Sequence, residues 1–254
     1  MGREGPDPVD EMNGTEPQSY QECEPLPARI VGIVRAPRRV LGHVAARRRW
    51  VDALLVGTIV SMASGVALLQ TAVGRQALVD QLERTAAAFG QPVDDAQYAR
   101  FQEMSQHGAT YAVLRAIATG PVLALGSAAI VAGLFSGLLG GRAGYTQVLA
   151  VTSHAGLVLA ARDVLGAPVS YARETLASPA TLTMFAPMLD EASPLARFFG
   201  AIDLFVLWWI VLLAAGVSLL YGRPLARTVL AFIGAYVGVA VLLVIAMVVS
   251  GGTV

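Results

Sequence analysis

Residues 201–221, AIDLFVLWWIVLLAAGVSLLY, and residues 228–250, TVLAFIGAYVGVAVLLVIAMVVS, decide the fold of this chain. The first run has one charged residue, Asp203, and the second has none. About 21 residues in a helix reach roughly 31 Å, which matches the roughly 30 Å hydrocarbon core of a bilayer. Because the basic connector 222–227 is so short, the two runs predict an antiparallel pair of membrane-spanning helices.

The composition also indicates a membrane protein. The mean hydropathy is +0.60, and 14% of the residues are charged, whereas about a quarter are charged in soluble domains. All 18 basic residues are arginine, which excludes a Schiff-base lysine and a phosphate-binding loop ending in Gly-Lys-Ser/Thr. The single cysteine, Cys23, cannot form a disulfide within the chain. No His-Glu-x-x-His or Cys-x-x-Cys spacing occurs, so we expect no metal site and no cofactor.

Three further apolar runs complete the pattern of an all-α polytopic bundle with five transmembrane helices. The predicted spans are about 51–73, 116–139, 145–161, 201–221 and 228–250. Arginines are concentrated in 29–50 and in the short loops that contain Arg142, Arg223 and Arg227. Because such loops stay in the cytoplasm, we expect a cytoplasmic amino terminus and a carboxyl terminus outside. The bias towards arginine, alanine and glycine favours a bacterial protein of the cytoplasmic (inner) membrane.

The first 50 residues divide into an acidic part and a basic part. Residues 1–28 contain seven acidic residues and five prolines, and we expect a disordered acidic tail because such a segment buries too little apolar surface. Residues 29–50 contain seven arginines and no acidic residue, which predicts a basic amphipathic helix at the membrane interface that binds anionic lipid. The arginines assigned to lipid binding are Arg35, Arg38, Arg39, Arg47, Arg48 and Arg49. Nucleic acid is not an expected partner, because Trp50 is the only aromatic residue of this segment.

The loops between the spans are predicted to be partly helical. Residues 76–89 and a segment that opens at Pro92 and Asp94 are each expected to form a short helix on the bilayer or on the bundle. Ser193 and Pro194 form a cap and first-turn pair, so the fourth helix is predicted to start there, before it enters the lipid. Residues 180–189 are apolar enough to enter the interface, and re-entry of the loop 166–200 into the membrane is left open.

Three stretches together resemble a known family. They are RAPRRVLGHVAARRRW (35–50), TQVLAVTSHAGLVL (146–159) and LARFFGAIDLFVLWWIVLLAAGVSLLYGRPLARTVLAFIGAYVGVAVLL (195–243). Over residues 29–249 the chain is similar to the bacterial branch of the Yip1 domain family. Members of this family are five-span membrane proteins with a cytoplasmic amino terminus. The resemblance implies a non-catalytic role in organising or remodelling membrane, or in scaffolding partner proteins. Eukaryotic members are linked to small prenylated GTPases, but their Asp-Leu-Tyr-Gly-Pro motif is missing here, which disfavours such a partner.

Small residues at helical spacing predict close helix packing. Gly133 and Gly137 lie four residues apart in the second predicted span, and Gly234 and Gly238 do so in the fifth. This spacing lets two helix backbones approach each other. We expect the four glycines to pack within one subunit, and an interface in a homo-oligomer is the alternative.

Ionisable residues inside the spans or at their ends are candidate functional groups. His154 lies near the middle of the third span, where we expect a neutral imidazole hydrogen-bonded within the bundle rather than a proton relay or ligand contact. Four further residues are placed at the outer ends of their spans: Arg115, Arg162, Asp163 and Asp203. They are expected either to form one ion-pair cluster or to extend separately into the headgroups.

Two other functions remain as alternatives to a scaffold. A small transporter or channel would use His154 and the outer charges as a polar path, although five spans cannot form two equal repeats. An intramembrane hydrolase would need Ser136 beside His154, but the sequence GLFSG (133–137) lacks the Gly-x-Ser-Gly order of such proteases. We therefore predict no enzymatic activity and no catalytic residue. The polar residues should face packed protein in a scaffold and a water-filled cavity in a transporter.

Overall fold

The described part of the chain is helical. The computed structural model describes residues 25–186, 188–189 and 193–250, so most of the predicted acidic tail lies outside the described residues. Within them, strand pairing is limited to an isolated bridge between Thr181 and Asp203. Five helices are long and apolar enough to cross a membrane. The prediction of an all-α chain with five helices able to cross a membrane is therefore confirmed.

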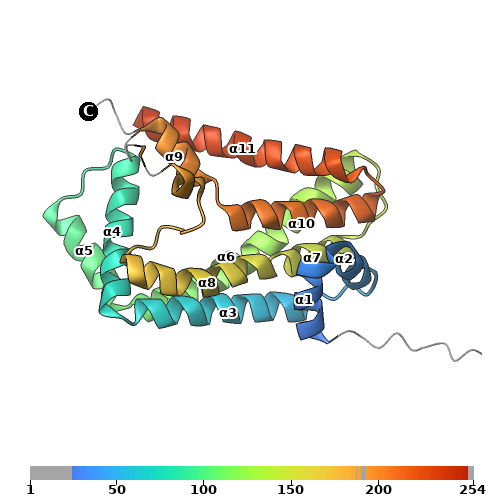
Figure 1. Cartoon of the computed structure of the whole chain (residues 1–254), viewed down its shortest axis with the longest axis horizontal. Helices are drawn as coiled ribbons and strands as arrows, with labels where there is room; N and C mark the ends of the chain where they lie inside the picture. Colours follow the sequence, from blue (N-terminus) through green and yellow to red (C-terminus); the bar gives the residue numbers. More distant parts are fainter. Residues whose placement is uncertain (1–24, 187, 190–192, 251–254) are drawn as a thin grey trace, which may run out of the picture.

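The long helices lie side by side. They are α3 (Val51–Leu69), α6 (Gly108–Ala132), α7 (Tyr145–Ala155) with α8 (Leu157–Arg173), α10 (Leu204–Tyr221) and α11 (Leu225–Ser250). A π-helix, η1 (Gly133–Leu138), continues α6, and α7 and α8 form one run that is interrupted at Gly156. Figure 1 shows α3 and α11 at opposite edges, with α8 and α10 between them. α3 packs on α6 and α8, whereas α10 packs on α7 and α11.

Small residues set the register of α3 against its neighbours. A Cβ added at Gly65, late in α3, would lie 3.2 Å from the Cβ of Ala112, early in α6, so these helices are antiparallel. A Cβ added at Gly57 would lie 3.7 Å from Leu157, so the start of α8 is level with the first half of α3. Figure 1 shows α3 and α8 running in the same direction.

Shorter helices cover the two ends of the bundle. α1 (Leu26–Arg35) and α2 (Pro37–Ala46) lie at one end, and α4 (Ala72–Ala88), α5 (Asp95–Gln106) and α9 (Pro194–Ala201) lie at the other (Figure 1). The side chains of Thr71, Asp94 and Ser193 accept backbone N–H groups at the starts of α4, α5 and α9. Such capping satisfies donors that a helix leaves unpaired. The helix starts predicted near Asp94 and at Ser193 are confirmed.

Helix boundaries differ from the prediction at three places. The second long helix begins at Gly108 rather than near 116, and the third extends to Arg173 rather than ending at 161. The charged residues there do not end the helices, because an α-helix pairs its own backbone groups whatever its side chains are. The helix that starts after Ser193 stops at Ala201. α10 then begins separately, because the carboxylate of Asp203 accepts the first free N–H groups of α10.

The basic segment 29–50 contains two helices instead of the single predicted one. α1 ends at Arg35 and α2 starts at Pro37, because a proline disfavours helical backbone at the residue before it, Ala36. α1 also begins at Leu26, inside the predicted acidic tail. The segment is thus a helix pair that turns at Ala36.

The four glycines chosen for helix packing do not hold this bundle together. Gly133, Gly137, Gly234 and Gly238 lie where, among the described residues, an added Cβ would meet no atom within 4 Å. Two helices do approach each other closely at a different glycine. A Cβ added to Gly216 of α10 would collide with the side chain of Val151 on α7. Spacing alone does not show which face of a helix is turned inwards, and these glycines lie on outward faces. Their place in a homo-oligomer stays a prediction.

Candidate functional site

Two polar clusters lie inside the helix bundle. The first, the buried triad, consists of Arg29, Asp52 and His154. The second, the hollow-lining cluster, consists of Arg115, Arg162, Asp163 and Asp203. The sequence predicted the second cluster and His154 as candidates, but it did not predict the partners of His154.

In the buried triad, Arg29 connects α1 to α3 and α7. Its guanidinium forms an ion pair with Asp52 at the start of α3 and a 2.9 Å hydrogen bond with Nε2 of His154 on α7. The side chain of Arg29 is 4% exposed, and His154 is completely buried. The triad therefore ties the first described helix to two membrane-spanning helices in a packed environment.

Hydrogen bonding determines the tautomer of His154. Nδ1 lies 2.9 Å from the carbonyl oxygen of Ala150, and because a carbonyl can only accept, Nδ1 is the donor. The guanidinium of Arg29 can only donate, so Nε2 is the acceptor. The imidazole is therefore neutral, with its proton on Nδ1, and both ring nitrogens are used by the protein.

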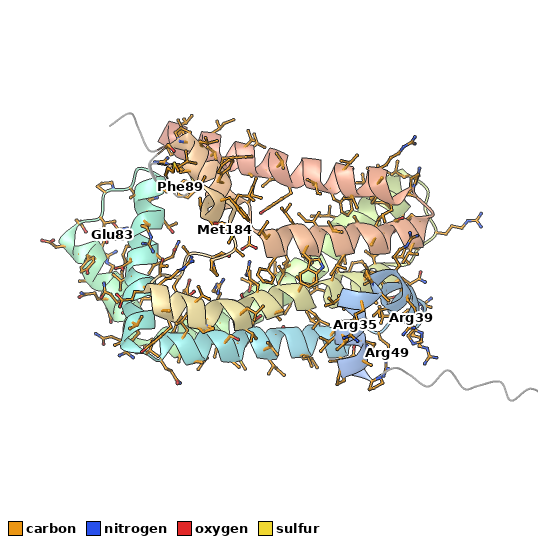
Figure 2. All side chains as sticks on the ribbon, viewed as in Figure 1. Arg35, Arg39, Arg49, Glu83, Phe89 and Met184 are labelled. Carbon is orange, nitrogen blue, oxygen red and sulfur yellow. The ribbon has the colours of Figure 1, made fainter. Side chains whose placement is uncertain are left out.

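The docked α1–α2 pair presents an arginine surface at its end of the bundle. Val40, Leu41 and Val44 on α2 are at most 1% exposed and α2 packs on α7 and α10, so the apolar face of α2 is buried against protein. The arginines assigned to lipid binding form the arginine surface, and none of them is buried; they are Arg35, Arg38, Arg39, Arg47, Arg48 and Arg49. Figure 2 shows three of them, labelled at this end, with Glu83 of α4 at the opposite end.

In the hollow-lining cluster, Arg162 of α8 is the shared partner. Its guanidinium lies 3.3 Å from the carboxylate of Asp163 and 3.9 Å from that of Asp203. Asp203 also accepts the hydroxyl of Ser178 at 2.5 Å, and the hydroxyl of Tyr236 on α11 accepts the backbone N–H of Asp203 at 3.2 Å. Of the two predicted alternatives, these three charged residues form the ion-pair cluster.

Two hollows meet at this cluster. A narrow cavity of about 240 Å³ lies between α3, α6 and α8, and a wide hollow of about 1070 Å³ extends from the same helices to α4 and α9. Arg115, Arg162, Asp163 and Ser61 line both. Within the described part of the chain Arg115 forms no ion pair, so its charge faces the hollows.

The hollow-lining cluster lies deeper than the predicted outer ends of the spans. The register of α3 with α6 and α8 brings Arg115 and Arg162 level with Met62, seven residues before the end of α3 at Leu69. Seven residues correspond to about 10 Å along a helix. An ionisable group at such a depth is costly unless it is paired or faces a polar cavity, which makes it a candidate functional group.

The narrow cavity ends next to His154. Thr152 and Ser153 line it, and the hydroxyl of Thr152 donates to the carbonyl oxygen of Ala124 at 3.2 Å. Ser153 is 3% exposed, and its Oγ has no hydrogen-bond partner among the described residues. Because an unpaired buried hydroxyl costs free energy, Ser153 is a locally unsatisfied position beside the narrow cavity.

Sequence reasoning did not single out Arg29 or its partner Asp52. One signal was present: Arg29 and Ile33 are four residues apart and so share a face of α1, and both are buried. An arginine on an apolar helix face is a sign of a buried partner. Ser178 and Tyr236, which hold Asp203, lie far from it in sequence and gave no comparable signal.

The residues of the hydrolase alternative are not brought together. The hydroxyl of Ser136 donates to the carbonyl oxygen of Ala143 at 2.8 Å, and it is 2.8 Å from the hydroxyl of Tyr221. The ring of His154 is fully occupied by Arg29 and Ala150. In the described ranges, no group of three or more His, Cys, Asp or Glu residues could hold a metal ion.

Comparisons of the chain with models of protein families, with curated proteins and with solved structures gave no match.

Proposed function

We propose that the chain is a non-catalytic membrane protein, similar to bacterial Yip1 proteins, that organises or remodels a membrane or holds partner proteins at it. One observation supports this proposal above the others: the α1–α2 pair is docked on the bundle, with its apolar face buried and the arginine surface outside it. A docked pair holds these charges at a fixed height relative to the spans. Clustered arginines next to a span attract anionic headgroups.

The same arginines support a location and an orientation. We place the protein in the bacterial cytoplasmic membrane, with the arginine surface and the amino terminus in the cytoplasm and the carboxyl terminus outside. Arg142, Arg223 and Arg227 lie in or beside short connections between spans, and arginine-rich short connections remain on the cytoplasmic side.

Energy transfer to labelled lipid tests this function in the full-length protein. Trp50, Trp208 and Trp209 pack against the core clusters that include residues of α1 and α2, so they are donors for dansyl-labelled lipids in proteoliposomes. We expect more transfer to dansyl-phosphatidylglycerol than to dansyl-phosphatidylcholine, a difference that salt should reduce. The variant R38Q/R47Q/R48Q should reduce this difference. Vesicles that the wild type deforms should stay round with this variant.

A matched control uses two arginines that lie away from this end and line neither hollow, in the variant R75Q/R100Q. It should keep the preference for dansyl-phosphatidylglycerol. Equal transfer to the two lipids in the wild type, or an unchanged preference in R38Q/R47Q/R48Q, would show that the arginine surface does not bind anionic lipid.

A second function, a small transporter or channel, is favoured by the two connected hollows and by the unpaired hydroxyl of Ser153. If the narrow cavity is part of an aqueous path, a cysteine that replaces Ser153 should react in intact membranes with a small, membrane-impermeant thiol reagent. The background variant Cys23→Ser should not react. A cysteine at 153 that reacts only after unfolding would exclude this second function.

A further inference from the structure

We propose that the wide hollow binds the phosphate headgroup of a phospholipid. The site is separate from the arginine surface, lies at the opposite end of the bundle, and goes beyond the function proposed above. Three properties of the hollow support it: an excess of positive charge, the depth of that charge, and an apolar wall beside it.

Positive charge dominates the lining of the wide hollow. Its arginines are Arg84, Arg115, Arg162, Arg173 and Arg197, and its acidic residues are Asp163 and Asp203. Both aspartates already contact Arg162, and the guanidinium of Arg84 donates to the hydroxyl of Thr175 at 3.1 Å. Arg115 and Arg173 form no ion pair with a described residue. Their charge is therefore available to an anion in the hollow.

The depth of Arg115 makes an anionic partner favourable. Arg115 is level with Met62, inside the span formed by α3, where an unpaired guanidinium is costly. A phosphate placed between Arg115 and Arg162 would neutralise that charge. Guanidinium groups bind phosphate oxygens through two parallel N–H donors, which makes arginine well suited to such a contact. The hydroxyl of Ser61, which also lines the hollow, adds a neutral donor.

An apolar wall indicates that the phosphate belongs to a lipid. Leucines line the hollow beside the arginines; they are Leu68, Leu69, Leu78, Leu82, Leu176 and Leu189. A free phosphate ion gains nothing from them and is much smaller than a hollow of about 1070 Å³. A phospholipid uses both walls, because it contacts the arginines through its headgroup and the leucines through its acyl chains.

Exposed apolar residues mark a route by which lipid enters. The 3-10 helix η2 (Leu182–Phe185) and α9 lie at this end, and Met184, Phe185 and Leu195 are at least 50% exposed. Large apolar side chains in this position are typical of segments that rest in the membrane interface. The hollow, which reaches Thr183 of η2 and Ala196 of α9, is therefore next to a lipid surface.

Native mass spectrometry of the full-length protein in detergent tests the site directly. Phosphatidylglycerol should bind in a saturable manner, and phosphatidylcholine, whose phosphate is neutralised by choline, should bind more weakly. Arg115→Gln and Arg173→Gln should each weaken phosphatidylglycerol binding about tenfold, the effect of losing one charge-assisted contact. The matched control is Arg100→Gln on α5, an exposed arginine at the same end that does not line the hollow.

Competition distinguishes a lipid from a free anion. If inorganic phosphate at millimolar concentration binds as well as phosphatidylglycerol and displaces it, the site takes a soluble phosphate and the lipid assignment is overturned. If Arg115→Gln and Arg173→Gln bind phosphatidylglycerol as tightly as Arg100→Gln does, the hollow is not the site. Arg48→Gln, on the arginine surface, should weaken phosphatidylglycerol binding less than Arg115→Gln and Arg173→Gln do, and a larger loss of binding in this variant would move the site to α1–α2. Arg173 is exposed, so Arg173→Gln remains informative if Arg115→Gln does not fold.

Discussion

The buried triad and the hollow-lining cluster both pair arginine with aspartate, but their central residues lie in different environments. His154 and Arg162 are eight residues apart along α7 and α8, about 12 Å, yet His154 is completely buried and Arg162 is 26% exposed. α1 supplies Arg29 to the triad, whereas no described element fills the space in front of Arg115 and Arg162. The comparison shows that the packing of a further helix, rather than residue type, separates a structural polar cluster from one that is available to a ligand.

Cysteine accessibility should give the largest contrast between the two clusters. In a Cys23→Ser background, a cysteine replacing Ser61, which lines both hollows, should react in intact membranes with an impermeant thiol reagent. A cysteine replacing His154 should react only after the protein is unfolded. Rapid reaction at 154 would show that the triad end is also open to water and would remove the contrast.

Packing next to the triad should be sensitive to a single added side chain. Gly216→Val forces a side chain into Val151, and overpacking of this kind should lower the free energy of unfolding by about 3 kcal/mol. Gly234→Val, where an added Cβ on α11 meets open space, should leave it unchanged within about 0.5 kcal/mol. Both changes in the free energy of unfolding are measured by unfolding the detergent-solubilised protein with increasing dodecyl sulfate. A large decrease in the free energy of unfolding of Gly234→Val would instead indicate an interface with a second copy of the chain.

Replacing an aspartate by asparagine should lower the free energy of unfolding by different amounts in the two clusters. Asp52→Asn removes the carboxylate that faces the buried Arg29 and should destabilise the protein by about 2 kcal/mol, with faster hydrogen exchange in α1 and α2. Asp163→Asn, in a pair whose side chains are about one-quarter exposed, should cost about 0.5 kcal/mol. Equal losses in the two variants would show that the burial of the partner arginine, 4% exposed for Arg29 and 26% for Arg162, does not set the cost.

Asp203 should be the carboxylate of the hollow-lining cluster with the larger structural role. Asp203→Ala removes the acceptor for the N–H groups of Phe205 and Val206, and the lost cap should cost about 1 kcal/mol. Asp203→Asn, which can still cap the helix, should recover most of that loss. If the two variants unfold alike, then the charge, through Arg162, matters more than the cap.

The sequence predicted the helices of this chain better than their contacts. Apolar runs such as 228–250 predict a span because length and hydropathy are local properties, and caps such as Ser193 act within four residues. The partners of a polar residue depend on which helices meet. For that reason the ion pair of Arg162 with Asp203 was one of two alternatives, and the contact of Arg29 with His154, which are 125 residues apart, was not predicted.

The glycines also show that the sequence does not reveal which faces of the helices pack together. A spacing of four residues is visible in sequence for Gly133 and Gly137 as well as for Gly234 and Gly238, but the direction of a helix face is set by tertiary contacts. Gly216 has no second glycine at this spacing, or anywhere else, in α10. It is nevertheless the glycine against which α7 packs. In the sequence it ends the run of small residues Ala214-Ala215-Gly216, and nothing there identifies Val151 as its contact.

The spans differ in length on the two sides of the molecule. α3 has 19 residues and α11 has 26, so their lengths are about 28 Å and 39 Å, and they lie at opposite edges (Figure 1). One bilayer can match both only if α11 tilts or if the lipid is thinner beside α3 than beside α11. If α11 does not tilt, the protein imposes a gradient of hydrophobic thickness across its own width. Such a gradient would give it a preferred position at boundaries between thicker and thinner membrane, whatever its partners are.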